Sequence, residues 1–512
     1  MATPNEKLAA SLGKLKDLQK DGRRVFKSDD LSRVGRERLI QNGFLKEVIR
    51  GWLISTSPNT KPSDTTPWYA SFWEFCARYC DDRFGADWHL SSEQSLLLNA
   101  ENTVIPAQVI VNSPRGTNNK VALLFGASLY DLKQKDMPPK GDLLVKDGLR
   151  LFAPAAALIR VPDNFFTRYP IEAQVVLTGI KDASEVLGRL LEGGHSVVAG
   201  RLAGAFRRVD RANIADEIIK TMRGAGYDAR ETDPFAAQQE FGKLTPGIAP
   251  IAGRVRALWE SLRDPVIKAF PKPPGIPKDT KPYLQFVEDI YKNDAYHSLS
   301  IEGYSVTPEL IERVQSGNWK PEESEGDRKS RDALAARGYW QAFQAVKKSV
   351  GKILEGAEPG ALVRTDHRDW YRELFQPSVA AGLLRPAALA GYRQHLVYLK
   401  GSRHVPPRWE SLADAMNAFF DLIEAETEPA PRIVLGHWLF GYIHPYPDGN
   451  GRMARFLMNA MFASGGYPWT VIRVEDREKY MKALESASVD NDIKPFTAFI
   501  AERVRWSIER TS

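Results

Sequence analysis

A short polar segment between two apolar stretches constrains the fold of this chain more than any other feature of its sequence. Residues 433–443 and 456–462 are largely apolar, whereas the segment between them reads HPYPDGNGRMAR and is rich in glycine and charge. Apolar stretches of this kind predict two buried helices joined by a loop. The loop ends where the second helix begins, so its last residues lie at a helix N-terminus.

The residue types in this loop are suited to binding an anion. A helix N-terminus presents backbone N–H groups and the positive end of the helix dipole. Gly449 and Gly451 allow the backbone to wrap around a phosphate, and Asn450 adds a side-chain donor. Arg452 and Arg455 are three residues apart on the first turns of the helix, so both can face one anion. The loop therefore predicts a phosphate site.

Two further side chains of the loop are suited to binding a metal ion and to removing a proton. Asp448 is a carboxylate in a basic pocket, and Mg²⁺ in proteins is typically held by one or two carboxylates together with phosphate oxygens. His444 has an ordinary pKa near neutrality and is suited to removing a proton from a hydroxyl. The chain contains no G-x-x-x-x-G-K-[ST] loop and no protein-kinase motif set. These residues predict group transfer from a nucleotide.

The segment resembles the Fic family of protein adenylyltransferases, whose motif is H-P-F-x-[DE]-G-N-G-R-x-x-R. The match fails only at Tyr446, which replaces phenylalanine. The resemblance implies that His444 takes the proton of a Ser, Thr or Tyr hydroxyl on a target protein, and that the oxygen attacks the α-phosphorus of ATP. Mg²⁺ on Asp448 assists, and pyrophosphate leaves. The kinase-like branch of the family carries lysine at the position of Gly451, so the glycine favours nucleotidyl transfer; a phosphocholine-transferring branch stays open.

Two flanking segments resemble the same family. Residues 391–407 resemble its β-hairpin flap, which aligns the target by strand addition. The flap residues expected to pair with the target are Val397, Tyr398 and Leu399. Downstream, Tyr480 and Asn491 fall in a segment that resembles the adenine side of the nucleotide pocket.

An inhibitory motif is expected upstream of the core. Ser298, Glu302 and Gly303 match the family pattern [ST]-x-x-x-E-[GN]. A glutamate delivered to Arg455 would form a carboxylate–guanidinium pair, and ATP would lose its γ-phosphate clamp. The alternative interpretation is a helix C-cap at Gly303. In some inhibited members the glutamate also serves removal of AMP, which Glu302 leaves open.

The first half of the chain has a different character. Residues 4–21 and 32–42 are predicted helices and residues 44–55 a hairpin-like strand, an arrangement typical of a winged helix. The net charge of +6 is compatible with nucleic acid but does not require it. The basic residues near the predicted winged helix are Arg23, Arg24, Lys27, Arg33, Arg36, Arg38, Lys46 and Arg50. They form either a solvated charged face or a phosphate-contacting surface on DNA.

The following region mixes helix and strand. Strands are expected at residues 104–111, 121–125 and 171–179. Residues 1–240 resemble the winged-helix antitoxins of abortive-infection pairs, through Gly51-Trp52-Leu53, the aromatic segment 68–73 and residues 88–91. That resemblance implies transcriptional regulation or partner binding.

The sequence of 512 residues thus predicts a multidomain protein. The N-terminal half is expected to be α+β, with a winged helix at residues 1–58 and a mixed α/β regulatory domain at 59–245. The C-terminal half is expected to hold a helical region with the inhibitory motif at 253–380 and an all-α Fic core with the β-hairpin flap at 381–512. Cys76 and Cys80, one helical turn apart, predict packed thiols.

The expected function is that of a self-inhibited protein adenylyltransferase that uses ATP and Mg²⁺. No apolar run is long enough to span a bilayer, and no membrane contact is expected. The two cysteines, expected as packed thiols, fit a reducing, cytoplasmic compartment. The alternative is a DNA-binding regulator, or a toxin–antitoxin-like fusion, in which the Fic core is a silenced nucleotide-binding module and residues 1–58 contact DNA. The sequence leaves open a homodimer, the target protein and the signal that releases inhibition.

Overall fold

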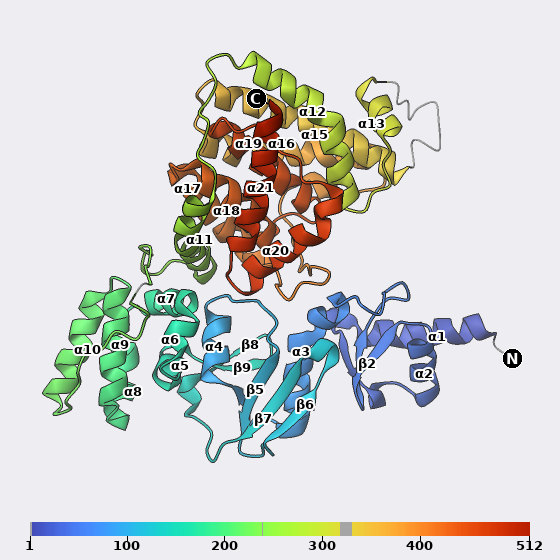
Figure 1. The fold of residues 1–512 in the computed structure, drawn as a ribbon. Coiled ribbons are helices and arrows are strands. Elements are labelled where there is room, and N and C mark those ends of the chain that lie inside the picture. The colour runs from blue at the N-terminus through green and yellow to red at the C-terminus, as the bar shows by residue number, and fades with distance from the viewer. Residues whose placement is uncertain (1–2, 238, 318–329, 512) are drawn as a thin grey trace. The chain divides into compact units, whose positions relative to one another are not determined.

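The computed structural model describes residues 3–237, 239–317 and 330–511, and the chain divides into two compact units. The first unit comprises Met1–Pro250 with Tyr398–Val405, and the second comprises Ile251–Val397 with Pro406–Ser512. The chain therefore crosses between the units after residues 250, 397 and 405. Figure 1 labels the elements of both.

The first unit begins with a small three-stranded antiparallel sheet, in the order β1-β3-β2. Its elements are α1 (Pro4–Leu18), β1 (Val25–Lys27), α2 (Arg33–Gln41), β2 (Leu45–Ile49) and β3 (Trp52–Ser55). The helices predicted at 4–21 and 32–42 are confirmed, and the predicted strand at 44–55 is a pair of strands. Gly51, with a φ of 87°, lies in the turn that joins them, a conformation that favours glycine.

A long aromatic helix, α3 (Thr66–Phe84), connects this sheet to a second one of order β4-β5-β7-β6. The strands that follow are β4 (His89–Leu90), β5 (Gln108–Ser113), β6 (Asn119–Ala122), β7 (Ser128–Lys133), β8 (Leu143–Lys146) and β9 (Leu149–Phe152). Trp68, Phe72 and Phe75 of α3 are fully buried in one core with residues of both sheets. Cys76 and Cys80 lie in the same core as free thiols, as predicted, and burial raises the pKa of each.

Helices complete the first unit, and one of them corrects a prediction. They are α4 (Ser92–Asn99), α5 (Pro154–Arg160), α6 (Phe165–Arg168), α7 (Pro170–Gly179), α8 (Ser184–Gly193), α9 (Ser196–Arg208) and α10 (Ala212–Gly224). The strand predicted at 171–179 is wrong, because that segment is α7. Nearly all of α7 is buried, and an apolar run buried on every side has no periodicity that separates helix from strand. The strands predicted at 104–111 and 121–125 are confirmed only in part, by β5 and β6.

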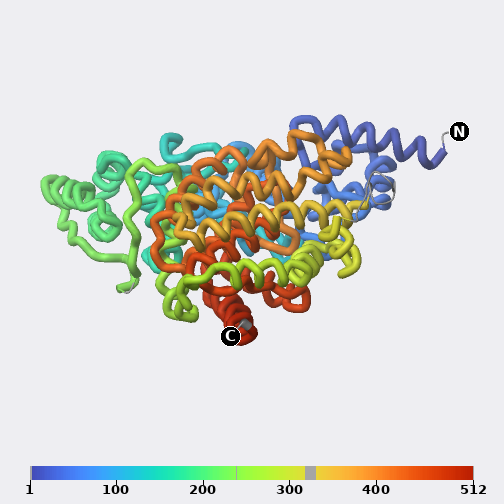
Figure 2. The backbone as a smooth tube through the Cα atoms, turned by 90° about the horizontal axis from the view of Figure 1, so that it is seen from above, coloured from blue at the N-terminus to red at the C-terminus, as the bar shows by residue number. Residues whose placement is uncertain are grey.

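The described residues of the second unit form helices joined by loops and contain no strand. Its helices are α11 (Pro250–Ala269), α12 (Lys281–Ile301), α13 (Pro308–Gln315), α15 (Arg331–Leu354), α16 (Pro359–Ala380), α17 (Leu412–Ala425), α18 (Pro429–Ile443), α19 (Asn450–Ser464), α20 (Arg477–Val489) and α21 (Lys494–Thr511). Helices α18 and α19 are buried along most of their length and form the central pair. Helices α15 and α16 run side by side (Figure 2).

Two expectations about the C-terminal half have different outcomes. The all-α core is confirmed, but the β-hairpin predicted within 391–407 is absent, since that segment forms turns and extended backbone without a strand. Its backbone groups bond elsewhere, as in the contact from Arg393 N to Pro445 O. Pro406 and Pro407 lack the N–H that a strand ladder needs. Among the described helices, none has both the length and the apolar character of a membrane span.

The contact between α15 and α16 yields a stability prediction. A Cβ on Gly338 of α15 would lie 2.0 Å from the backbone oxygen of Leu374, so Gly338→Ala must push the two helices apart. We expect a loss of about 1–3 kcal/mol in unfolding free energy, measured as a lower midpoint of heat unfolding by circular dichroism. Gly351→Ala in the same helix is the matched control, because its nearest atom lies 3.9 Å away. The control should be neutral or stabilised by up to about 1 kcal/mol, and equal destabilisation of both variants would contradict the argument.

Candidate active site

The polar loop lies between α18 and α19, as predicted, and both of its ends adopt left-handed backbone. His444 closes α18 with a φ of 52°, and Gly449 precedes α19 with a φ of 79°. A Cβ on Gly449 would lie 2.7 Å from the Phe375 ring, so glycine is required for space as well as conformation. The Asn450 amide bonds both backbone groups of Tyr446, at 2.9 and 2.8 Å. Asn450 therefore braces the loop, a role different from the phosphate donor expected from its sequence.

The imidazole of His444 is held in one tautomer. Its Nδ1 lies 3.2 Å from the Gly441 carbonyl, which can only accept, so Nδ1 carries the proton and Nε2 keeps its lone pair. Burial lowers the pKa of His444 to about 4, which leaves the ring neutral near pH 7. A neutral ring with a lone pair on Nε2 is the form a general base needs.

Arg393, which sequence reasoning treated only as an edge of the flap, positions this histidine. Its Nε donates to the His444 carbonyl at 2.9 Å, and its backbone N–H donates to the Pro445 carbonyl at 2.9 Å. A further guanidinium nitrogen bonds the Pro407 carbonyl. A lone arginine 51 residues upstream carries no local signal for this role.

The two arginines of the motif are buried side by side at the start of α19. Arg455 is 4% exposed, and its Nη2 bonds Glu302 Oε1 at 2.7 Å while its Nε bonds Ser298 Oγ at 2.8 Å. Arg452 lies between the rings of Tyr304 and Phe375, 5.2 and 5.1 Å from their centroids. Tyr304 and Phe375 belong to distant segments, and sequence reasoning missed both.

The side chain of Glu302, from the end of α12, lies against the first turns of α19. Burial disfavours its charge, but the positive charges of Arg455 and Arg452 outweigh that effect and lower the pKa of Glu302. A Cβ on Gly451 would lie 2.3 Å from Glu302 Oε1, so the carboxylate rests directly against this glycine. Glu302 is the C-cap of α12, and Gly303, with a φ of 84°, is the left-handed residue that follows it. The end of α12 and the contact of Glu302 with Arg455 thus lie in one turn, and the inhibitory role of this contact stays a prediction.

Asp448 is the residue proposed for Mg²⁺. Its side chain is 65% exposed, its Oδ1 accepts from Gly449 N at 2.7 Å, and its Oδ2 lies 3.5 Å from Arg452 Nη2. The described residues contain no group of three His, Cys, Asp or Glu side chains able to hold a metal. One exposed carboxylate does fit a Mg²⁺ ion that a nucleotide brings along, because phosphates and water then fill the remaining positions.

The two residues expected on the adenine side, Tyr480 and Asn491, lie in the first turn of α20 and just after its end. Tyr480 of α20 hydrogen-bonds His437 of α18 at 2.7 Å and lies within hydrogen-bonding reach of Arg455. Burial lowers the pKa of His437 to about 3, so His437 is a neutral, packed residue. Asn491 follows α20 in a left-handed turn with a φ of 54°.

The segment expected to align a target is divided between the units, because Val397 belongs to the second and Tyr398–Val405 to the first. Within the first unit, the Arg24 guanidinium lies 5.6 Å from the Tyr398 ring centroid. Ile105 N donates to Arg403 O at 2.8 Å. Residues 398–405 are therefore fixed by contacts other than those of a hairpin.

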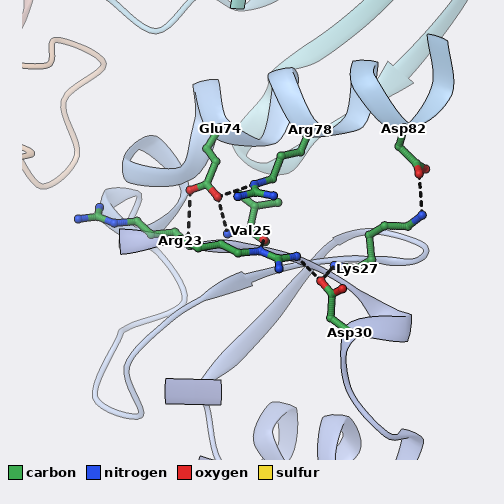
Figure 3. A network of polar contacts seen from close by, with 8 residues as sticks. Arg23, Val25, Lys27, Asp30, Glu74, Arg78 and Asp82 are labelled. Carbon is green, nitrogen blue, oxygen red and sulfur yellow. Dashed lines mark hydrogen bonds and ion pairs between the residues drawn. The ribbon is translucent and has the colours of Figure 1, made fainter. Parts of the chain in front are cut away.

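Many basic side chains of the predicted DNA surface have partners inside the first unit. Figure 3 shows the partners of Arg23 and Lys27. Glu74 of α3 accepts from the backbone N–H groups of Arg24 and Val25 and from Arg78. The cationic side chains with intramolecular partners are those of Arg23 with Asp30, Lys27 with Asp82, Arg33 with Glu37, Arg36 with Ser28 O and Arg38 with Lys7 O. Contact with DNA would compete with these bonds.

Comparison with known proteins finds a family match that includes the loop. Residues 362–462 match the model of the Fic/DOC family. The protein adenylyltransferase Fic of Nematostella vectensis is 29% identical over 260 residues, which cover 50% of this chain and 57% of that protein. The protein of the same name from Drosophila willistoni is 38% identical over 125 residues, 24% of each chain. The chain therefore contains a Fic domain, and it spans little more than half the length of the first of these relatives.

Solved structures include a similar chain, Fic-1 from C. elegans. It is 18% identical, with 66% of this chain and 94% of that chain covered at a TM-score of 0.38.

Tyr446 leads to a prediction about the loop. Its ring stacks on Tyr371 at 3.8 Å, but its buried hydroxyl has no hydrogen-bond partner in the described part of the chain. Tyr446→Phe should therefore keep or raise stability, by up to about 1 kcal/mol, measured by urea unfolding. Tyr442→Phe is the control, because the Tyr442 hydroxyl accepts from the buried Arg254 at 2.9 Å. That control should lose about 1–3 kcal/mol, and a larger loss for Tyr446→Phe would overturn the assignment.

Proposed function

We propose that this protein is a self-inhibited protein adenylyltransferase that transfers AMP from ATP to a hydroxyl side chain of a target protein. The observation that carries the proposal is that the neutral His444 begins the loop, while two buried arginines, Arg452 and Arg455, lie on the first turns of the helix that follows the loop. The similar proteins of Nematostella and Drosophila are named protein adenylyltransferases, which supports the same reaction here.

The side chains of the loop divide the reaction between them. His444 Nε2 removes the proton of the target hydroxyl, and the oxygen forms a bond to the α-phosphorus as the bond to the β-phosphate oxygen breaks. The backbone N–H groups at Asn450 and Gly451 and the guanidinium groups of Arg452 and Arg455 stabilise the phosphate charge. The Gly449 N–H would join them by exchanging its bond to Asp448 Oδ1 for one to phosphate. Mg²⁺ held through Asp448 would neutralise further charge on the phosphates when bound. Pyrophosphate leaves and the proton stays on the imidazole.

Glu302 supplies the inhibition in this proposal. Its carboxylate satisfies the Arg455 guanidinium that a γ-phosphate would otherwise use, and it rests against Gly451. ATP bound beside Glu302 would be displaced from the in-line geometry that transfer requires. Ser298, which bonds Arg455 twice, holds the helix that delivers the glutamate.

DNA recognition by residues 1–58 stays outside this proposal. The order of helices and strands there supports a winged-helix-like module. Several of its cations form ion pairs within the unit, and a DNA phosphate would have to replace those contacts.

The proposed function predicts the effect of removing the inhibitory carboxylate. Glu302→Gly should incorporate label from [α-³²P]ATP and Mg²⁺ into protein about tenfold or more faster than the wild type, since even about 1.4 kcal/mol of competition changes an equilibrium tenfold. Incorporation is measured on denaturing gels, with the protein itself and a cell lysate as acceptors. Glu302→Gly/His444→Ala is the control and should incorporate none. Label from [γ-³²P]ATP instead would mean phosphate transfer, and no label from either would contradict the proposal.

The low pKa of His444 predicts the pH dependence. Because burial holds this pKa at about 4, the ring stays neutral and active as the pH falls through 6.5, and activity is lost only as the pH approaches the lowered pKa. Glu302 raises the pKa of His444, so its removal in Glu302→Gly lowers this pKa further. The acid limb of kcat/KM for Glu302→Gly should therefore be centred below about pH 5.5. A limb centred at 6.5 or above would show that His444 titrates as an exposed histidine.

A further inference from the structure

Helix α12 carries three polar side chains on one face, each one turn after the last. They are Asp294, Ser298 and Glu302, and this four-residue spacing places them in a row along the helix. Ser298 and Glu302 contact Arg455, whereas Asp294, at the upstream end of the row, belongs to no motif described above.

Asp294 is 4% exposed and accepts a hydrogen bond of 2.6 Å from the hydroxyl of Tyr339, a fully buried residue of α15. Burial raises the pKa of Asp294 to about 6, against the lowering effects of the Tyr339 hydrogen bond, the nearby Trp469 indole and the Arg455 charge, so the carboxylate is mostly ionised at neutral pH. A buried carboxylate opposes stability unless its bonds compensate. Because Asp294 lies between α12 and α15, we consider its role to be in setting how these two helices pack.

Tyr339 connects this carboxylate to the row below it and to α19. Its hydroxyl lies within hydrogen-bonding reach of Ser298, and its ring packs on Phe456 of α19 with centroids 4.8 Å apart. Because Arg455 Nε donates to Ser298 Oγ, the serine proton is directed away from Arg455 and can donate to Tyr339. The chain of donors then runs from Arg455 through Ser298 and Tyr339 to the Asp294 carboxylate.

We infer that the Asp294–Tyr339 hydrogen bond is a positioning contact that sets the register of α12 against α15 and α19, so that Ser298 and Glu302 reach Arg455. Helices α12, α15 and α19 all contact one another, and Tyr339 is a side chain of α15 that contacts both of the others (Figure 1). A rotation or slide of α12 that separates Asp294 from Tyr339 moves Glu302 as well, because both belong to one rigid helix. This inference rests on the proposed function only where it is tested by AMP incorporation; its test by hydrogen exchange does not need that activity.

The test is Tyr339→Phe in the full chain, which removes the hydroxyl but keeps the ring on Phe456. We expect AMP incorporation to rise roughly fivefold or more toward the level of Glu302→Gly, with faster amide hydrogen exchange at residues 298–304. In the Glu302→Gly background the same change should leave incorporation unaltered, since no inhibitory carboxylate remains to be positioned. Asp294→Asn keeps an acceptor oxygen and should release inhibition less than Tyr339→Phe does.

Tyr291→Phe is the matched control. Tyr291 is a fully buried residue of α12, three residues before Asp294, and its hydroxyl has no hydrogen-bond partner among the described residues. Its removal should leave both incorporation and exchange at wild-type values.

Three results would overturn the inference. The first is wild-type incorporation and exchange in Tyr339→Phe while Glu302→Gly is active. The second is an equal gain from Tyr339→Phe in the presence and absence of Glu302, which would place its effect outside the inhibitory contact. The third is an equal effect of Tyr291→Phe. If Glu302→Gly transfers no AMP, the proposed function fails, and hydrogen exchange at residues 298–304 in Tyr339→Phe alone decides this inference.

Discussion

The buried guanidinium of Arg455 is the group on which the rest of the site depends. A cation removed from water needs both an anion and hydrogen bonds, and an unpaired one costs several kcal/mol. Here Glu302 provides the anion, while Ser298 provides a hydroxyl and a carbonyl oxygen. In the proposed function, nucleotide binding and inhibition both meet this one electrostatic requirement, because a phosphate could take the place of the Glu302 carboxylate on Arg455. The same buried cation would then stabilise either a bound phosphate or the contact with α12.

The rigidity of this site comes from the helix pair beneath it. Helices α18 and α19 are buried along most of their length, so the loop between them has fixed ends. His444 gains a defined tautomer from Gly441 and a fixed backbone from Arg393. The same burial that orders the imidazole also lowers its pKa, so order and neutrality have one cause.

Much of the loop's geometry was predictable because the residues that define it lie within twelve consecutive positions. His444, the turn at Gly449 and the arginines at Arg452 and Arg455 act through local geometry, which sequence spacing encodes. Arg393, Tyr304 and Tyr339 were not predictable, since each reaches its partners from a segment far from the loop in the sequence: Arg393 and Tyr304 from loops, and Tyr339 from α15. Asn450 was expected to donate to a phosphate, and its two bonds to the Tyr446 backbone are a further contact that spacing alone does not reveal.

The errors in the fold have equally specific causes. Residues 171–179 lack the exposed positions that would have marked a helix, since α7 is buried on nearly every side. The expected hairpin at 391–407 was inferred from family resemblance, and the backbone of this segment bonds other parts of the chain instead. The order of Tyr398–Val405 belongs to the first unit, through contacts such as Ile105 with Arg403. Residues 398–405 therefore take their conformation from the first unit, although they lie within the stretch of sequence that the family resemblance assigns to the core.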